Sequence, residues 1–284
     1  MLKTLILVII IFVGMSFYDS STSQKQPPAT SKQIEQQEER AAASLFFALL
    51  PPRETWPSPI QKFYLAFNMN EVIDPIRENP DWISLPAIPK DLQQAIIAIE
   101  DHNFYEHGAL ALEGVLRAAL VNISAGEIVQ GGSTLTQQFV KNVFLTHEQS
   151  MERKIEEAVL SLMLEDKYSK DEILELYLNT TYLGAGATGL TQAAKIYFGK
   201  SPQALTLAES AVIAALPYAP SALNPLENPA GCKKRQLLVL QTMQKYGFID
   251  QERAKAAAAE PIYLTNGTKM KKSAAVSKTA ALFI

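Results

Sequence analysis

The feature that most constrains the fold is a succession of helical patterns that begins after Pro89 and contains no run of alternating strand character. Three sites within it match the capping box, in which a short polar side chain precedes a glutamate or glutamine by three positions at a helix N-terminus. The three pairs are Asp91 with Gln94, Ser169 with Glu172, and Thr206 with Glu209. Pro217 ends the third helix, because proline has no N–H to donate. The pattern predicts a mainly α domain.

An almost uninterrupted apolar run from Leu5 to Phe17 follows Lys3 near the N-terminus. We expect this run to enter a membrane as an uncleaved transmembrane anchor, because no clear small-x-small cleavage site follows it. A cleaved secretory signal is the alternative, since the run is shorter than the roughly 20 residues of a full span. Both interpretations export the rest of the chain, and Lys3 places the N-terminus in the cytoplasm.

Composition divides the chain into four parts. Residues 1–18 form the expected anchor, and residues 19–43 form a polar linker that is too poor in apolar side chains to build a core. Residues 44–263 form the globular domain, and residues 264–284 form a tail for which we expect poor order. The apolar stretch Leu45–Leu50 is either a core element or part of a surface that touches lipid.

Charge and cysteine content exclude several classes of function. The formal net charge of -3, from 26 basic and 29 acidic residues, gives no basic field for nucleic-acid binding, so we expect no nucleic-acid partner. The single cysteine, Cys232, excludes an intramolecular disulfide framework and a multi-cysteine metal cluster.

The first group of residues with chemical potential lies at Ala98–Leu110, where a strongly apolar helix ends in Glu100 and Asp101. A carboxylate at a helix C-terminus meets the negative end of the helix dipole, and apolar neighbours desolvate it. Both effects raise its pKa, so Glu100 is a candidate general base. Taken alone, an acidic pair at a helix end is more often solvated or caps the next helix. His107 taken alone is also more often structural.

The second group is the segment Gly131–Asn142, in which two glycines precede a run of hydrogen-bond donors and a helical stretch. Backbone N–H groups at a helix start, together with the positive end of the dipole, form a site for phosphate oxygens. The ordinary alternative is a polar helix start with Ser133 as N-cap. The segment lacks the Gly-Lys-Ser/Thr ending of a nucleotide-binding phosphate loop.

The third group is the segment Met151–Asn179. The spacing of Ile155, Ala158 and Leu162 predicts that this stripe faces the core. A neighbouring stripe places Arg153 four residues before Glu157, which is most often a surface ion pair. Glu156 competes with Glu157 for any catalytic role.

Together and in this order, the motifs resemble the peptidoglycan glycosyltransferases, the domain of monofunctional glycan polymerases and of class A penicillin-binding proteins. The resemblance runs from about Trp82 to Gly247. The matched positions are Glu100, Asp101 and Phe104, followed by His107; Gly131–Asn142; Arg153, Lys154 and Glu157; Lys170, Ile173, Leu174, Glu175, Tyr177, Leu178 and Asn179; and a last stretch, Gly184–Pro225. The third motif selects Glu157 over Glu156.

The resemblance implies a lysozyme-like, mainly α fold of two lobes, with the smaller lobe against the membrane. It implies that Glu100 and Glu157 are catalytic: Glu100 deprotonates the 4-hydroxyl of lipid II, and Glu157 orients cations or the leaving group. The implied substrate-binding residues are Asp101, Phe104, His107, Ser133, Thr134, Gln137, Gln138, Lys141, Asn142, Arg153, Lys154 and Glu175. Lys141 and Arg153 are the cations expected to hold pyrophosphate. Lys233 is expected to be a surface lysine without a role.

The resemblance also implies ligands and a location. A divalent ion, magnesium or manganese, is compatible with the chemistry and would bind at Glu100, whereas no nucleotide or organic cofactor is implied. The expected partners are lipid II, the nascent glycan strand on undecaprenyl pyrophosphate, membrane lipid and other cell-wall synthesis proteins. The expected location is the bacterial cytoplasmic membrane, with a single span and the catalytic domain on the outer side.

The sequence departs from the family pattern in two respects. Gly108 follows His107 directly, where many members have one residue between them, and Ala111 stands where an aspartate is common, so we expect a small loop adjustment. The chain contains no Ser-x-x-Lys, which a serine transpeptidase needs. We therefore expect no transpeptidase activity, in either a monofunctional enzyme or the front part of a longer one.

Two other functions are compatible with parts of the pattern. A glycan-cleaving lytic enzyme also relies on one glutamate of raised pKa, but it has no need of the donor-rich segment Gly131–Asn142. A catalytically silent scaffold has no physical need of Glu100, Lys141, Arg153 and Glu157.

Overall fold

The computed structural model describes residues 58–110, 132–146 and 150–270. The expected anchor, the linker and the stretch Leu45–Leu50 lie outside the described residues. Among the helices that the structure describes, none has both the length and the apolar character needed to cross a membrane. The chain divides into two compact units, residues 1–74 and residues 75–284.

The described part of the first unit contains α3 (Ser58–Phe67) and most of α4 (Asn70–Arg77). The hydroxyl of Tyr64 donates a hydrogen bond of 2.7 Å to Glu71, which fixes the turn between the two helices.

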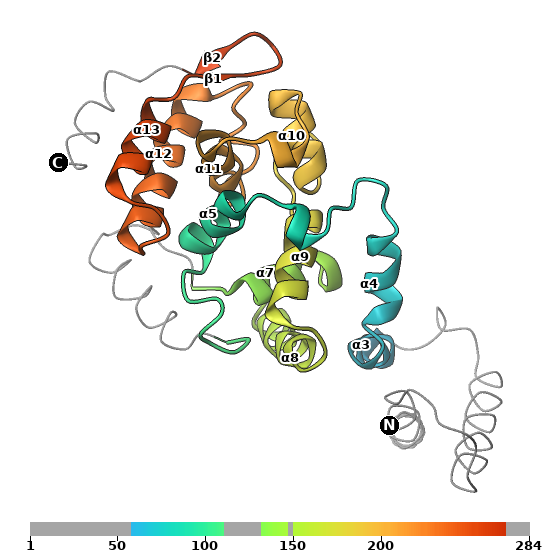
Figure 1. The fold of residues 1–284 in the computed structure, drawn as a ribbon. Coiled ribbons are helices and arrows are strands. Elements are labelled where there is room, and N and C mark those ends of the chain that lie inside the picture. The colour runs from blue at the N-terminus through green and yellow to red at the C-terminus, as the bar shows by residue number, and fades with distance from the viewer. Residues whose placement is uncertain (1–57, 111–131, 147–149, 271–284) are drawn as a thin grey trace, which may run out of the picture. The chain divides into compact units, whose positions relative to one another are not determined.

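The described part of the second unit is mainly helical, as the sequence predicts (Figure 1). Its elements are the 3₁₀ turn η2 (Leu85–Ala87), α5 (Lys90–Glu100), α7 (Leu135–Phe144), α8 (Met151–Lys167), α9 (Lys170–Thr180), α10 (Leu190–Phe198), the 3₁₀ turn η3 (Pro202–Ala204), α11 (Leu207–Ala215), α12 (Pro229–Lys245), α13 (Gln251–Ala259) and the strands β1 (Ile262–Tyr263) and β2 (Lys269–Met270). The two strands form an antiparallel hairpin in which Ile262 pairs with Met270.

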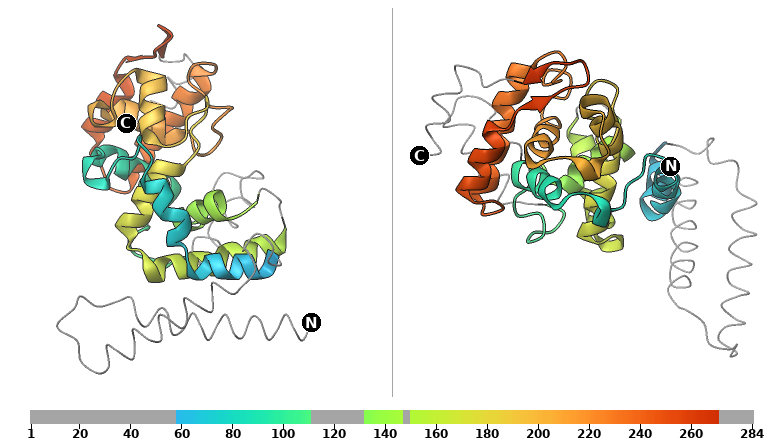
Figure 2. Two further views of the ribbon diagram at one scale, coloured as in Figure 1. Left: turned by 90° about the vertical axis from the view of Figure 1, so that its right-hand side faces the viewer. Right: turned by 45° about the horizontal axis from the view of Figure 1, so that its top comes forward.

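The core of the second unit is built around α11, which packs against α5 and α12 (Figure 1, Figure 2). Every residue of α11 from Ala208 to Ala215 is buried, and four of them are alanines, which let neighbouring helices approach closely. A second group consists of α7 with α8 and α9 packed against it. Glu100 ends α5, so it lies where the helix leaves the buried α5–α11–α12 group.

Two of the three expected capping boxes are confirmed, at Ser169 with Glu172 and at Thr206 with Glu209. The third is wrong. Helix α5 begins at Lys90, directly after Pro89, and has no side-chain cap. The carboxylate of Asp91 instead accepts two hydrogen bonds, of 2.9 and 3.0 Å, from Arg253 of α13. Asp91 therefore forms an ion pair with a distant helix and does not form the cap of α5 that the local pattern predicted.

The expected orientation of α8 is also wrong. Ile155 is 63% exposed and Leu162 is 53% exposed, whereas Glu157 and Leu164 of the neighbouring stripe are buried. The helical period is correct, but the buried face is displaced by about one position along the sequence. The charged stripe can face inward because Arg153 and Lys154 neutralise the Glu157 carboxylate, so that its burial is tolerated.

Two further expectations need correction. Residues 264–270 are part of the folded unit, since β2 pairs with β1 and Met270 is buried, so the globular domain extends beyond residue 263. Lys233 is not a surface residue: it is 1% exposed, and its ammonium group donates a hydrogen bond of 2.9 Å to the Ala258 carbonyl of α13. Helix α12 packs against both α11 and α13, which encloses this side chain.

Candidate active site

Glu100 is the last residue of α5 and follows the buried run Ile96–Ala98. Its side chain is half-buried at the end of the helix where the dipole is negative. Burial raises the pKa of Glu100 above its ordinary value, and the negative charge of Asp101 adds to the rise. A carboxyl group in this environment is suited to accept a proton near neutral pH.

One hydrogen bond orients the Glu100 carboxylate. The side-chain amide of Gln138 on α7 donates to Glu100 Oε2 at 2.9 Å. The Gln138 oxygen accepts in turn from the hydroxyl of Tyr177 on α9 at 3.2 Å. Because an ionised carboxylate can only accept, the Gln138 NH₂ group faces Glu100, and the Gln138 oxygen faces the Tyr177 hydroxyl. Burial raises the pKa of Tyr177 well above its ordinary value, so its hydroxyl remains a donor.

Two cations face the same carboxylate. Lys141 lies three residues after Gln138, on the same side of α7, and Arg235 comes from α12. After burial, which raises the pKa of Glu100, the Gln138 hydrogen bond and the charges of Arg235 and Lys141 act in the opposite direction. These contacts keep the ionised form of Glu100 accessible despite its burial.

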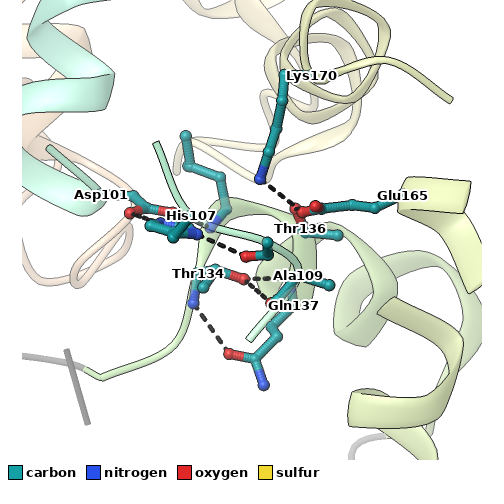
Figure 3. A network of polar contacts seen from close by, with 10 residues as sticks. Asp101, His107, Ala109, Thr134, Thr136, Gln137, Glu165 and Lys170 are labelled. Atoms are coloured by element: carbon teal, nitrogen blue, oxygen red, sulfur yellow. Dashed lines mark hydrogen bonds and ion pairs between the residues drawn. The ribbon is translucent and has the colours of Figure 1, made fainter. Parts of the chain in front are cut away.

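Asp101 is held by the protein itself, as Figure 3 shows. Its Oδ1 accepts from His107 Nε2 at 2.6 Å, and its Oδ2 accepts from the backbone N–H of Leu135 at 3.0 Å. Leu135 is the first residue of α7, so Asp101 and His107 tie the loop after α5 to the start of that helix. Asp101 and His107 therefore help to hold in place the end of α5, where Glu100 lies.

The first turn of α7 differs from the expected phosphate site. Thr134, and not Ser133, is the N-cap, and it forms a capping box with Gln137. The Thr134 hydroxyl also donates to the Ala109 carbonyl at 2.9 Å (Figure 3). Because Asp101 accepts the Leu135 N–H and Thr134 accepts the Gln137 N–H, the anion at this helix terminus is a carboxylate of the chain itself. Thr134 and Gln137 are occupied in building the helix start.

A second cluster joins the start of α7 to the first turns of α8. The ammonium group of Lys154 donates to Ser133 Oγ at 3.1 Å and also to the carboxylate of Glu157. Arg153 Nη1 lies 3.5 Å from the second oxygen of Glu157. The carboxylate is almost fully buried, while Lys154 is partly exposed. Glu157 therefore holds two cations, and because its carboxylate balances only one of the two charges, a net positive charge remains for an anion.

The other implied substrate-binding residues lie as follows. Phe104 is completely buried, with the Lys170 ammonium 4.6 Å from its ring centroid, so it contributes to packing. Lys170 pairs with Glu165 at 2.7 Å, and Thr136 donates to the same oxygen at 2.5 Å (Figure 3). Asn142 is exposed on α7. Gly131 lies outside the described residues.

Glu175 serves the scaffold, because its carboxylate accepts the backbone N–H of Leu85 at 2.6 Å. Asn179, one turn later on α9, accepts from the N–H of Ile83 and donates to its carbonyl, both at 2.9 Å. These two side chains hold the extended segment that leads into α5. They determine where Glu100 lies without approaching it.

Two residues were missed in the sequence: Arg235, which acts on Glu100, and Tyr218, which lies beside Arg235. Arg235 is the third of three consecutive cations, Lys233 to Arg235, and no local pattern indicates which of them turns toward the site. Its guanidinium carbon lies 4.2 Å from the ring centroid of Tyr218, which follows α11. Tyr177 lies in a recognised motif, but its link to Gln138 depends on how α7 and α9 pack.

The expected divalent ion at Glu100 stays a prediction. The groups that face this carboxylate are an amide NH₂ and two cations, so a magnesium or manganese ion bound there would take its other oxygen ligands from water and substrate phosphates. Both oxygens of Asp101 are already hydrogen-bonded to His107 and Leu135. Within residues 58–110, 132–146 and 150–270, no group of three metal-binding side chains occurs.

Comparison with known proteins assigns this chain to a family. A family model described as transglycosylase matches residues 68–244, which is more than half of the chain. The chain belongs to the transglycosylase family. This membership confirms the resemblance to the peptidoglycan glycosyltransferases that the ordered motifs indicated.

The names of individual similar proteins are consistent with this family. A putative transglycosylase of Cupriavidus necator is 43% identical over 194 residues, which cover 68% of this chain and 84% of that protein. Penicillin-binding protein 1A of Aquifex aeolicus is 45% identical over 190 residues, which cover 67% of this chain and 26% of that protein. The chain thus spans about a quarter of the length of this relative. A crystal structure of penicillin-binding protein 1A from Haemophilus influenzae is 26% identical and covers 71% of this chain and 20% of that chain, at a TM-score of 0.39, which is too low to establish a shared fold.

The hydrogen bond from Gln138 gives a prediction about pH. It stabilises the ionised form of Glu100, so Gln138→Leu should raise the pKa of Glu100 further. If the ionised form is the active one, the loss of kcat/KM on acidification should begin at higher pH in the variant. Tyr177→Phe should shift the same limb in the same direction by less, because Gln138 is then only less well oriented. A profile of kcat/KM for glycosyl transfer against pH measures both shifts; an unchanged or acid-shifted limb in Gln138→Leu would contradict this assignment.

Proposed function

We propose that the protein is a peptidoglycan glycosyltransferase that polymerises lipid II into glycan strands and has no transpeptidase activity in this chain. The observation that carries the proposal is the Glu100 carboxylate, which is half-buried at a helix end, oriented by Gln138 and faced by Lys141 and Arg235. Family membership supports the reaction class. Incubation of the purified protein with lipid II, followed by separation of the glycan products, tests it.

In the proposed reaction, Glu100 removes the proton from the 4-hydroxyl of lipid II as that oxygen attacks the anomeric carbon of the growing strand. The new glycosidic C–O bond forms as the bond from the anomeric carbon to the pyrophosphate oxygen breaks, with inversion. The electron pair leaves with undecaprenyl pyrophosphate, and the proton stays on Glu100 until solvent accepts it. The raised pKa of Glu100, which results chiefly from its burial, matches a group that must take up a proton near neutral pH.

Negative charge grows on the pyrophosphate as it leaves, and cations placed beforehand stabilise that charge. Lys154 and Arg153, both anchored on Glu157, and Lys141 on α7 are the groups proposed for this role. Ser133 adds a hydroxyl beside Lys154. In this proposal Glu157 acts by orienting cations.

A lytic enzyme is the closest alternative, because a glutamate of raised pKa also serves glycosidic cleavage. The cluster of Arg153, Lys154 and Glu157 favours the polymerase, since cleavage of an uncharged glycoside produces no anionic leaving group. The same assay separates these functions: a polymerase lengthens glycan from lipid II, a lytic enzyme shortens preformed glycan, and a scaffold does neither.

We further propose a single-span protein of the bacterial cytoplasmic membrane, with Lys3 inside and the chain from Gln24 onward outside, where lipid II, nascent glycan and other cell-wall synthesis proteins are met. The apolar run Leu5–Phe17 supports this topology. Protease added to intact spheroplasts should digest the globular domain while a cytoplasmic marker protein stays intact. Digestion only after the membrane has been opened would show the opposite orientation.

A further inference from the structure

Tyr218 stands out on the surface of the second unit, because an aromatic ring that is 56% exposed lies next to a residue that faces Glu100. It follows the end of α11 at Ala215 and lies in the turn between α11 and α12. Its neighbour Arg235 belongs to α12, which packs against both α11 and α5, the helix that ends in Glu100. The ring is therefore linked to Glu100 through a single residue, Arg235.

The backbone around Tyr218 is supported from a second loop. Gly184 has a φ of +85°, and a Cβ at this position would lie 2.4 Å from the Pro220 carbonyl oxygen and 2.9 Å from the Tyr197 hydroxyl. The loop that contains Gly184 thus lies directly against the turn that contains Tyr218. Only glycine permits both the conformation and the close approach.

The ring itself is held from one side. The guanidinium carbon of Arg235 lies 4.2 Å from the ring centroid, within the range of a cation–π interaction. An exposed aromatic surface, held on one side by Arg235, therefore lies one residue away from Glu100 in space.

We propose that Tyr218 forms a sugar-binding subsite, in which one face of a pyranose ring packs on the exposed face of the Tyr218 ring while the Arg235 guanidinium holds the opposite face. This subsite rests on the proposed function and adds to it a determinant of glycan binding. A pyranose presents a face of C–H groups, and the negative face of an aromatic ring attracts the slightly positive hydrogens of such groups. Because the ring is already held in place, little side-chain entropy is lost when a sugar binds.

The test compares Tyr218→Ala and Tyr218→Phe in lipid II polymerisation. Tyr218→Ala should raise KM roughly tenfold and leave kcat within about a factor of two, because the contact exists in both the bound substrate and the transition state. Tyr218→Phe keeps the ring and should remain close to wild type. Tyr263→Ala is the matched control, since Tyr263 is 59% exposed and has the Lys269 ammonium 5.2 Å from its ring centroid, in the β1–β2 hairpin.

Three results would overturn the subsite. In the first, Tyr218→Ala has an unchanged KM. In the second, it loses kcat at constant KM, which would mean that the ring only positions Arg235. In the third, Tyr218→Phe is as impaired as Tyr218→Ala, which would make the hydroxyl and not the ring the important group.

A binding measurement separates this inference from the proposed function. Saturation-transfer NMR with a soluble β-1,4-linked N-acetylglucosamine oligomer should detect transfer from the wild-type protein and from Tyr218→Phe, but not from Tyr218→Ala. If the wild type fails to polymerise lipid II and still shows this pattern, the proposed function fails and the subsite stands. If Tyr218→Ala binds the oligomer as well as the wild type does, the subsite fails whatever the activity.

Discussion

Glu100→Gln should lower the rate of lipid II polymerisation by roughly three orders of magnitude, within the range that a positioned general base contributes. Glutamine keeps the shape of the side chain and can still pair with the Gln138 amide after a flip, but it cannot accept the proton of the attacking hydroxyl. The fold should persist, since a carboxyl group whose pKa is raised by burial is replaced by a neutral group of the same size. Initial rates with lipid II and thermal unfolding measure the two effects.

Glu106→Gln is the matched control for this variant, because Glu106 is exposed in the loop that follows α5 and should be silent. A Glu100→Gln enzyme that retains more than about a tenth of the wild-type rate would remove Glu100 from the role of general base.

Lys141→Ala and Arg153→Ala should each lower kcat on the order of 100-fold, which is the usual loss when one preorganised group that stabilises developing charge is removed. The reason is that charge on the pyrophosphate is greater in the transition state than in the bound substrate, so kcat should fall at least as much as affinity. Stability should change little for Lys141, which is exposed on α7. Steady-state kinetics with lipid II and thermal unfolding distinguish the two contributions.

The control for the cation variants must be an exposed lysine far from Glu100, such as Lys255 on α13. Lys233 is unsuitable, because Lys233→Ala would leave a cavity and the Ala258 carbonyl without its donor, and should destabilise the fold by about 2 kcal/mol or more. If both Lys141→Ala and Arg153→Ala polymerise lipid II at nearly the wild-type rate, the pyrophosphate site lies elsewhere.

The helical architecture was predictable from the sequence because it depends on local signals. Capping boxes at Ser169 and Thr206 involve residues three positions apart, so they can be recognised without tertiary information. The orientation of α8 was not predictable in the same way, since both of its stripes carry aliphatic residues and the choice depends on packing against α7. Asp91 has the same limitation, because its partner Arg253 is 162 residues away.

The sequence predicted the central residues of the candidate site well and the residues around them less well. Glu100, Gln138 and Lys141 do meet, as the motifs implied. Several polar motif residues, among them Asp101 and Glu175, instead hydrogen-bond to backbone groups of the chain. A motif shows that a polar group is needed, but it does not show whether that group faces a ligand or another part of the fold. Arg235 was missed because helical packing alone brings it to Glu100.

The double attachment of α5 to α7 has a consequence for motion. Asp101 accepts from the Leu135 N–H and Glu100 accepts from the Gln138 side chain, so two consecutive carboxylates are held by residues one turn apart on a single helix. Any bending or sliding of α7 relative to α5 must break both contacts or carry both along. Thermal fluctuations should therefore displace the proton acceptor and its hydrogen-bond donor together, as one rigid body. The alignment of Glu100 can then survive movements that a less firmly attached carboxylate would not.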